Sequence, residues 1–367
     1  MTFPLRRTVL LSAVAIGGVL GRAGWGLPSA LGASRARIRP YAAGSPQFRD
    51  RGFRNALPAT MVAAGEQGSL LRAIIARGKV GQPSKPVPVS APQMTAPAGE
   101  LAVTWLGHAS ALVELDGAVV LLDPVWSERA SPSTVLGPRR MHPVPLELPD
   151  LPRLDAVLIS HDHYDHLDMA TVRALLRTQT APFVVPLGIG AHLRGWGVPD
   201  ERIIELDWGQ QTEVAGLTLT CTEARHFSGR GLVRNTTLWA SWVIAGHTQR
   251  VFFGGDTGYT PAFASIGAEH GPFDLTLLPV GAYGDQWPDI HMNPEQAVAA
   301  HHDLRGGLLV PIHWATFNLA FHPWAEPADR TRVAAKERDV ALAIPRPGER
   351  VTVADPPELD DWWTPVA

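Results

Sequence analysis

Six consecutive residues have the side chains and the spacing of a metal site: His161-Asp162-His163-Tyr164-Asp165-His166. They follow an apolar stretch, residues 154–159, that is typical of a buried strand. His161 and His163 are two residues apart, so in an extended backbone their rings point to the same side and can bind one ion. Asp165 and His166 can bind a second ion beside it. Imidazole and carboxylate ligands without thiolate favour Zn²⁺, with Fe or Mn as alternatives.

Two ions need more ligands than one loop supplies, and later strand patterns offer three. His226 follows the alternating segment 217–222, Asp256 follows the apolar run 251–253, and His313 follows the apolar segment 308–312. Each alone would more often be a structural polar residue, but after the histidine motif the set is expected to supply ligands. The glycines that flank Asp256 would let the backbone pass close to the ions, so this carboxylate is expected to bridge them.

The elements that must position these residues read as an α/β layered domain, because strand patterns alternate with helix patterns at residues 168–177 and 293–303. The second helix pattern has Asn293 as N-cap, followed by Pro294, with Gln296 three residues after the cap. Asp123 ends another apolar run, residues 119–122, where a carboxylate could orient a ligating imidazole or simply open the turn at the following proline. His108, which follows a glycine, is open to the same two interpretations.

The chain resembles the metallo-β-lactamase-fold hydrolases and, within them, the family of N-acylphosphatidylethanolamine-hydrolysing phospholipases D. The resemblance implies an αββα sandwich, in which two sheets pack face to face with helices outside, and a dinuclear zinc site at one edge. It assigns His161, His163 and His226 to one ion and Asp165, His166 and His313 to the other, with Asp256 bridging. The matching segments run in order along the chain at residues 105–110, 122–124, 127–132, 137–139, 156–168, 204–208, 255–259, 271–275 and 312–314.

The resemblance also implies how the site would work. Two cations lower the pKa of a bridging water to give hydroxide near neutral pH, and they neutralise charge on the attacked centre. His291 matches a family His that would act near the leaving oxygen, and its alternative is a helix-terminal polar residue. Arg230, four residues after His226, matches a family Arg that could hold a phosphate or carboxylate bidentately, with a solvated surface Arg as the alternative. Where the family has Gln before the His, this chain has Ile290, whose side chain cannot hydrogen-bond.

The predicted function is therefore zinc-dependent hydrolysis of a phosphodiester in phospholipids such as N-acylphosphatidylethanolamine. A lactonase or amide hydrolase of the same fold is the alternative within enzymes, because the metal pair can also polarise a carbonyl. A periplasmic metal- or lipid-binding protein without turnover is the alternative outside them. Cys221 is the only cysteine and lies in a strand pattern, so it is expected to pack in the core.

Composition agrees with an ordinary globular enzyme. The 367 residues are 45% hydrophobic and 18% charged, enough for one large core, and we expect one catalytic domain with extensions. The net charge of -3 gives no global attraction for nucleic acid, so none is expected as a partner. The sequence contains no P-loop, dinucleotide-binding glycine pattern or CxxC motif.

The N-terminus indicates export. Arg6-Arg7 precedes an apolar run, residues 8–20, of signal-peptide length, and a membrane-spanning helix would need about 20 apolar residues. A twin-arginine signal over residues 1–36 is predicted, giving a periplasmic or membrane-associated protein, with an uncleaved anchor as the alternative. Residues 37–100 are predicted to form an extension with a short helix near 70–75, residues 101–350 the catalytic domain and residues 351–367 a tail. The 12 tryptophans could contribute to peripheral membrane contact, although tryptophans are more often buried.

Overall fold

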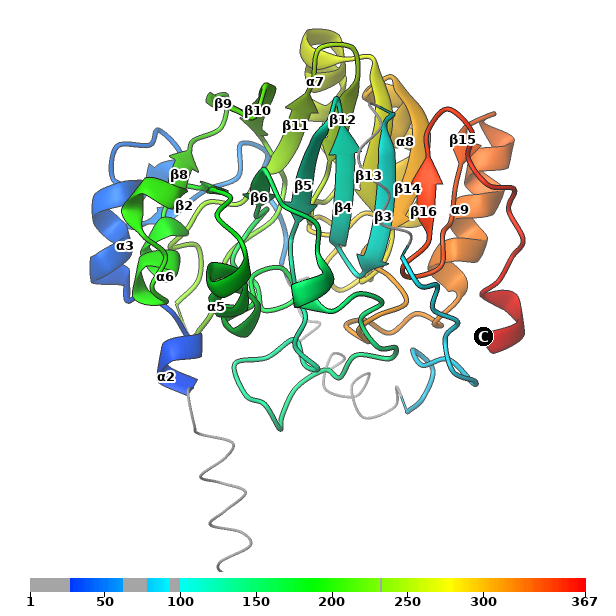
Figure 1. The fold of residues 1–367 in the computed structure, drawn as a ribbon, viewed down its shortest axis with the longest axis horizontal. Helices are drawn as coiled ribbons and strands as arrows, with labels where there is room; N and C mark the ends of the chain where they lie inside the picture. Colours follow the sequence, from blue (N-terminus) through cyan, green and yellow to red (C-terminus); the bar gives the residue numbers. More distant parts are fainter. Residues whose placement is uncertain (1–26, 62–77, 93–99, 232) are drawn as a thin grey trace, which may run out of the picture.

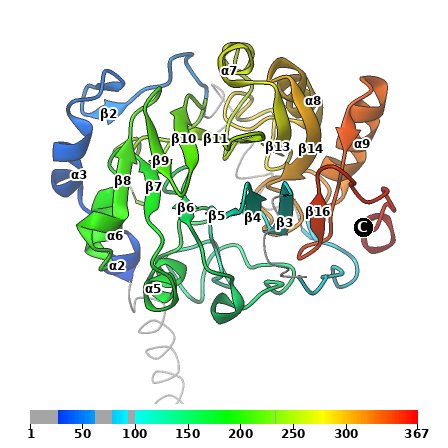
Figure 2. The ribbon, with the colours of Figure 1, turned by 45° about the horizontal axis from the view of Figure 1, so that its top comes forward.

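Two seven-stranded sheets face each other in the computed structural model, and helices cover the outer face of each sheet (Figure 1). The structure describes residues 27–61, 78–92, 100–231 and 233–367. The view in Figure 2 separates the two layers, with α5 and α6 beside one sheet and α7 and α8 beside the other. The architecture is the αββα sandwich that the sequence predicts.

The first sheet combines antiparallel and parallel strands. Its helices are α5 (Met169–Thr178) and α6 (Gly190–Gly195), and Asp168 caps α5 by accepting a hydrogen bond from the backbone N–H of Ala170. The helix predicted from residue 168 thus begins one residue later, because Asp168 is its cap. The strands lie in the order β16 (Arg350–Thr352), β3 (Ala102–Gly107), β4 (Ser110–Leu115), β5 (Ala118–Leu122), β6 (Ala156–Leu158), β7 (Phe183–Pro186) and β8 (Ile203–Leu206), parallel from β5 onward.

The second sheet has the same mixed character, with parallel pairing from β12 to β15. Its helices are α7 (Ala262–His270), α8 (Pro294–Asp303) and α9 (Glu326–Glu337). Asn293 and Gln296 form the predicted capping box at the start of α8. The strands lie in the order β15 (Ala341–Leu342), β14 (Gly306–Ile312), β13 (Phe273–Pro279), β12 (Arg250–Phe253), β11 (Ser241–Ala245), β10 (Leu217–Thr222) and β9 (Gln211–Val214).

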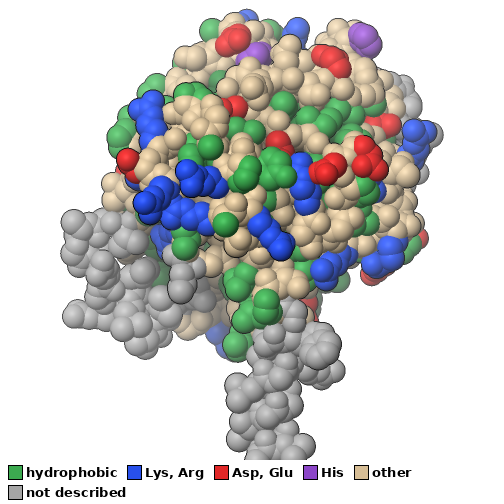
Figure 3. All heavy atoms as spheres, turned by 90° about the vertical axis from the view of Figure 1, so that its left-hand side faces the viewer, with side chains coloured by type: hydrophobic (Ala, Val, Ile, Leu, Met, Phe, Trp, Pro, Cys, Tyr) green, Lys and Arg blue, Asp and Glu red, His purple; other side chains and the backbone are tan. Residues whose placement is uncertain are grey.

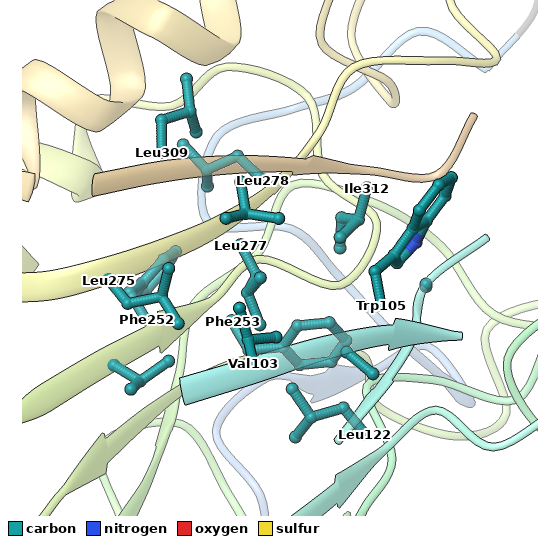
Figure 4. Close-up of a cluster of buried hydrophobic side chains, with 14 of the residues drawn as sticks. Val103, Trp105, Leu122, Phe252, Phe253, Leu275, Leu277, Leu278, Leu309 and Ile312 are labelled. Atoms are coloured by element: carbon teal, nitrogen blue, oxygen red, sulfur yellow. The ribbon is translucent and has the colours of Figure 1, made fainter. Parts of the chain in front are cut away.

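The core lies between the sheets, and a second apolar layer lies under α5 and α6. In β5, Val120 and Leu122 face the core between the sheets, while Val119 and Leu121 face the helix layer. Both faces of this strand are buried, which explains why its sequence is continuously apolar rather than alternating. Figure 4 shows the inner cluster, where Leu122 of one sheet approaches Phe253 of the other. Cys221 is fully buried in the same cluster, as predicted.

An N-terminal segment wraps one side of the sandwich. It contains α2 (Leu27–Ala30), α3 (Arg35–Ala42) and a small hairpin of β1 (Phe48–Arg49) and β2 (Gly52–Phe53). Trp196 Nε1 donates to the carbonyl of Ser29, so the packed chain begins before residue 36, where the predicted signal peptide ends. That boundary is therefore too late as the start of the folded part. Residues 1–26, on which the signal prediction depends, and the predicted helix at 70–75 lie outside the described residues.

The C-terminal residues belong to the sandwich. β16 pairs with β3, so the boundary predicted after residue 350 cuts a strand of the first sheet. Trp362 and Trp363 are buried, and their rings lie 5.5 and 6.2 Å from that of Trp314. The predicted tail therefore contributes to the core. Three short 3₁₀ turns complete the described elements: η1 (Leu148–Asp150), η2 (Asp200–Arg202) and η3 (Thr364–Val366).

The described tryptophans do not form a surface. Each is buried or partly buried, and the peripheral membrane contact considered from the sequence stays a prediction. The face built by the N-terminal segment instead exposes arginines beside hydrophobic side chains (Figure 3), among them Arg35, Arg37 and Arg39 of α3. Within the described residues, no helix has the length and apolar character needed to cross a bilayer.

Candidate functional site

The predicted ligands lie where strands of one direction end. The histidine motif follows β6, His226 follows β10, Asp256 follows β12 and His313 follows β14. β10 and β12 are each antiparallel to β11, and β12 to β14 are parallel, so these carboxyl ends share one edge of the second sheet. In the first sheet β5 and β6 are also parallel, which brings Asp123 beside the histidine motif. All seven predicted ligands meet at this edge.

One group of four donors consists of His161, His163, His226 and Asp256. Their ligand atoms all lie within 4.8 Å of one another. Nδ1 of His163 is 2.8 Å from Nε2 of His161 and 3.3 Å from Nε2 of His226. Oδ2 of Asp256 is 3.8 Å from Nε2 of His161 and 3.7 Å from Nε2 of His226. Three imidazoles and one carboxylate oxygen thus surround a single point.

A second group shares the carboxylate of Asp256. Oδ2 of Asp165 lies 3.5 Å from Nε2 of His166 and 3.4 Å from Nε2 of His313. These two imidazole nitrogens lie 3.2 Å from Oδ2 and 3.0 Å from Oδ1 of Asp256, respectively. The Asp256 carboxylate therefore stands between the two groups, in the bridging position that the sequence predicts. His108 joins this second group through Asp165.

The donor chemistry fits bound cations. Nε2 of His166, Nε2 of His313 and Oδ1 of Asp256 are buried and have no hydrogen-bond partner within the described part of the chain. Buried polar atoms of this kind are costly unless a partner satisfies them. With no thiolate among the donors, the set suits Zn²⁺ first by ligand type, with Fe or Mn as alternatives. The residues present therefore fit a metal-dependent site.

Protonation of the cluster depends on burial and on the two carboxylates. Burial lowers the pKa of His161 and of His226 well below the usual range, which keeps these imidazoles neutral. Burial also opposes protonation of His313, but the nearby carboxylates of Asp256 and Asp165 raise its pKa to about 9. A cation must displace that proton before the ring can bind it, so metal binding is expected to release protons.

The outer nitrogens of the ligating rings are held by other groups. Nδ1 of His161 lies 2.9 Å from Ser160 Oγ, and Nδ1 of His226 lies 2.8 Å from the carbonyl of Ile290. Nδ1 of His166 lies 2.7 Å from Oδ2 of Asp123, so the predicted orienting role of this carboxylate agrees with its position. Such contacts fix the ring orientation and direct the other nitrogen inward.

His108 is placed to orient the second group. Its Nε2 lies 2.8 Å from Oδ2 of Asp165, and its backbone carbonyl accepts from the N–H of His313. Burial lowers its pKa to about 3, so the neutral ring donates to Asp165 through Nε2–H. This contact agrees with the orienting role considered from the sequence.

The backbone makes unusual turns at the site. His108, Asp123 and His313 have φ values of 55°, 37° and 64°, a left-handed region that non-glycine residues seldom adopt and that is enriched at functional sites. At Gly255, φ is 55° and an added Cβ would lie 2.4 Å from Cβ of Ser160. Only glycine therefore fits beside Ser160 at this position, while the close passage of these glycines to the ions stays a prediction.

A pocket of about 310 Å³ opens beside the two groups. His163, Asp165, Asp256 and His291 form its polar side. Nδ1 of His291 lies 3.9 Å from Oδ2 of Asp256, and burial lowers its pKa to about 4, so its ring is neutral near pH 7. The position agrees with a contact to bound substrate. The remaining wall is formed by Met61, Phe227, Arg234, Ala282, Trp287, Ile290 and Leu319.

Arg230 does not reach this pocket, which contradicts the substrate-binding role predicted for it. Its guanidinium is 4% exposed in a separate pocket. It donates to the backbone carbonyls of Ala30, Asp162 and Leu167 and lies over the ring of Tyr164 at 4.1 Å. Each of its three guanidinium nitrogens therefore donates within the protein, and Arg230 joins the N-terminal segment to the histidine-rich loop.

Sequence reasoning missed residues whose role depends on distant contacts. Asn55 lies far from the ligands in sequence, yet its side chain accepts from the N–H of His226 and donates to the carbonyl of the same residue. Asp162, the one carboxylate of the motif without a predicted role, lies 3.3 Å from Nε2 of His192 and accepts from the N–H of Gly229. No local pattern marks Asn55. A role for Asp162 could have been inferred from the sequence, because this residue lies within the histidine motif.

Comparisons with known proteins agree with this geometry. The beta-lactamase superfamily domain matches residues 119–314, which include all seven predicted ligands. An uncharacterized protein of Mycobacterium tuberculosis is 54% identical over 98% of this chain and 99% of its own length. N-acyl-phosphatidylethanolamine-hydrolyzing phospholipase D 1 of Caenorhabditis elegans is 40% identical over 65% of this chain and 71% of its own length. The mitochondrial enzyme of that name from Saccharomyces cerevisiae is 30% identical over 64% and 51%, respectively.

A solved structure leads to the same family. Igni18, a metallo hydrolase from Ignicoccus hospitalis, is 25% identical and superimposes with a TM-score of 0.53 over 68% of this chain and 97% of its own. The family match, the relatives and the clustered His and Asp donors therefore agree. The chain belongs to the beta-lactamase superfamily and is a metal-dependent hydrolase of the metallo-β-lactamase fold that resembles the N-acylphosphatidylethanolamine-hydrolysing phospholipases D.

Proposed function

We propose that the protein hydrolyses a phosphodiester in lipids of the N-acylphosphatidylethanolamine type, in the manner of a phospholipase D. The observation that carries the proposal is the composition of the pocket, whose lining combines metal-ligand donors with apolar side chains. Such a pocket suits an amphiphile whose polar linkage must reach the donors while its chain stays on the wall. The named activities of the worm and yeast relatives support the same substrate class.

We further propose that two zinc ions are held here. His161, His163 and His226 would hold one, Asp165, His166 and His313 the other, and Asp256 would contact both. Bound as a pair, the ions would supply an activated water near neutral pH and stabilise the charge that develops on the attacked phosphorus. The protein's own contribution is to keep seven donors in place before substrate arrives.

His291 and the apolar wall would position the substrate. The neutral ring of His291 can donate one hydrogen bond through its N–H, and its place beside Asp256 puts that donor within the polar side of the pocket. Ile290 lines the same pocket, so the position where the related phospholipases carry Gln adds apolar surface here. This exchange favours a chain or glycerol carbon near the linkage over a further hydrogen bond.

The size of the pocket supports a binding mode in which most of the lipid stays outside the protein. A volume of about 310 Å³ is at the small end for a ligand pocket. We propose that the acyl chains remain in a lipid surface while the headgroup linkage enters. Exposed Leu31, Leu57 and Val233 on the described surface support such contact. Export, indicated by Arg6-Arg7 and the apolar run behind it, stays a prediction.

The test is a substrate panel with zinc-loaded protein. N-acylphosphatidylethanolamine in vesicles, bis-p-nitrophenyl phosphate, a homoserine lactone and a cephalosporin would be compared by mass spectrometry and absorbance. We expect release of a phosphomonoester from the first two. Turnover confined to the lactone or cephalosporin would reject the proposal in favour of the lactonase or amide hydrolase.

A variant separates catalysis from binding. Asp256→Asn removes one negative charge from the bridging position and should lower turnover by at least about 10²-fold, as loss of a key electrostatic group does in other enzymes. Asp274→Asn, a change of the same kind at a position outside the pocket lining, is the control and should leave turnover unchanged. Absence of hydrolysis in both the wild type and Asp256→Asn, with equal vesicle binding, would instead support a non-catalytic lipid-binding protein.

A further inference from the structure

Two arginines of one loop have opposite environments. Arg230 is buried and its guanidinium donates to backbone carbonyls, whereas Arg234, four residues later, is exposed and lines the pocket beside the metal-ligand groups. The turn at Gly229, where φ is 152°, and the bond from the N–H of Asn235 to the carbonyl of Ser228 direct the loop so that it returns toward the pocket. The family resemblance indicates Arg230 as the residue that binds substrate, whereas in the structure Arg234 lies at the site.

The ring of Phe227 lies between the guanidinium of Arg234 and the ligand cluster. Its Cζ lies 5.2 Å from the ring centre of Phe227, and the same ring lies 4.5 Å from that of His163. Nη1 approaches Sδ of Met61 at 3.8 Å, a weak acceptor. Phe227 therefore separates the positive charge of Arg234 from the cations that the ligands would hold. The separation is about the length of a lipid headgroup.

No carboxylate within the described residues pairs with Arg234. Other arginines of the surface do form ion pairs, such as Arg330 with Glu295 at 2.6 Å and Arg139 with Glu128 at 2.5 Å. The two carboxylates that line the pocket, Asp165 and Asp256, both belong to the ligand groups. An arginine without a carboxylate partner in a pocket with apolar walls attracts anions, because the walls weaken solvent screening.

We propose that Arg234 binds the anionic oxygens of the substrate while Met61, Trp287 and Leu319 hold the adjoining chain. The ligand class is an amphiphile with a phosphoryl or carboxylate group next to its apolar part. A planar guanidinium fits either group through two parallel hydrogen bonds. This inference deepens the proposed function and rests on it for the identity of the group, since a phosphodiester would place its charged oxygens between the cations and Arg234.

Binding of small amphiphiles tests the proposal without turnover. Octyl phosphate, octanoate and neutral octyl glucoside share a chain length and would be titrated by calorimetry, below their micelle concentrations, into zinc-loaded protein. Arg234→Met keeps the length of the side chain and removes its charge. We expect octyl phosphate to bind about ten-fold more weakly to this variant and octyl glucoside to change less than two-fold. Arg234→Lys should recover part of the loss, because it restores the charge without the fork.

Two comparisons make the outcome decisive. Arg153→Met, the same change at an exposed arginine outside the pocket lining, should leave all three affinities unchanged. Repeating the titrations after chelation of metal separates Arg234 from direct coordination, and the difference between wild type and Arg234→Met should persist. Equal weakening of octyl phosphate and octyl glucoside, or no weakening of either anion, would overturn the proposal.

The two anions identify the group, and the assay is independent of the function test. An Arg234-dependent loss for octyl phosphate that exceeds the loss for octanoate supports a phosphoryl ligand, and the reverse order supports a carboxylate. If the substrate panel shows no phosphodiester hydrolysis but octyl phosphate binding still depends on Arg234, the phospholipase proposal fails while the anion site stands.

Discussion

The carboxylate of Asp123 holds both the backbone and a side chain of the histidine-rich loop. Oδ1 accepts from the N–H of Ser160 at 2.7 Å, and Oδ2 accepts from Ser160 Oγ at 2.5 Å and from Nδ1–H of His166 at 2.7 Å. Burial raises the pKa of Asp123, and the hydrogen bond with His166 opposes that shift. One fully buried group thus determines which nitrogen of His166 faces the metal position.

A variant that lacks this carboxylate should still fold but should bind metal more weakly. Asp123→Asn keeps the size of the side chain but presents one amide group where two oxygens accept hydrogen bonds. Contacts behind a ligating His are typically worth about 10–100-fold in metal affinity, so we expect a loss of that order. Competition with a chelator measures it. Asp150→Asn, at an exposed carboxylate of η1, is the control, and equal affinity of the two variants would contradict the assignment.

The N-terminal segment acts as a part of the site. Asn55, just after β2, makes two hydrogen bonds to the backbone of His226 and accepts a third from Nε1 of Trp239. A few residues further, the carbonyl of Pro58 accepts from the guanidinium of Arg225. The loop that follows β10 is therefore fixed from outside the sandwich, by a segment that contributes no predicted ligand.

Removal of the Asn55 side chain should loosen His226. Asn55→Ala loses three hydrogen bonds at a partly buried position, and at roughly 1 kcal/mol each we expect the free energy of unfolding to fall by about 2–3 kcal/mol. Metal titration should show weaker binding as well. Asn55→Asp is the matched variant, because it keeps the acceptor for His226 N–H and Trp239 and loses only the donor. Denaturant melts should therefore rank Asn55→Asp between wild type and Asn55→Ala, and identical midpoints would exclude this role.

Packing of helices on the sandwich makes the stability of the whole protein sensitive to acid. His301 of α8 is 2% exposed, and its Nδ1 lies 2.7 Å from Thr276 Oγ1 of β13. Burial lowers its pKa to about 4, with a smaller contribution from His302. An unfolded chain titrates its His near 6.5 and so binds more protons than the folded chain between pH 6.5 and 4. The stability gained by keeping His301 neutral is therefore lost as pH falls through this window.

A residue that cannot titrate should remove part of that sensitivity. His301→Gln keeps a hydrogen-bonding group for Thr276, and between pH 7 and pH 5 it should lose about 2 kcal/mol less of its free energy of unfolding than the wild type loses. Urea melts at the two pH values measure the difference. The exposed His247→Gln serves as control and should follow the wild type. Parallel pH dependence of the wild type and His301→Gln would show that other groups cause the acid sensitivity.

Local pattern predicted the ligand set and an α/β layered domain, while the two facing sheets were predicted from the family resemblance. His226, Asp256 and His313 each follow an apolar run, and strands of one direction in a sheet bring their ends to one edge, so sequence order alone predicts their meeting. The capping box of α8 and the burial of Cys221 likewise depend on near neighbours. Local pattern did not predict that the C-terminal residues are part of the core. Trp362 and Trp363 have no periodic pattern, and they pack against the distant Trp314.

The amino-acid sequence by itself determined the metal-ligand types, the alternation of strand and helix patterns, and the family. Only the tertiary structure decided which of Arg230 and Arg234 faces the pocket, and that Asn55 fixes a ligand from the far N-terminal side. The physical reason is range: periodicity and caps reflect interactions between residues a few positions apart. The path of a loop instead depends on contacts such as that between Arg230 and the carbonyl of Ala30, which exist only once the chain has folded.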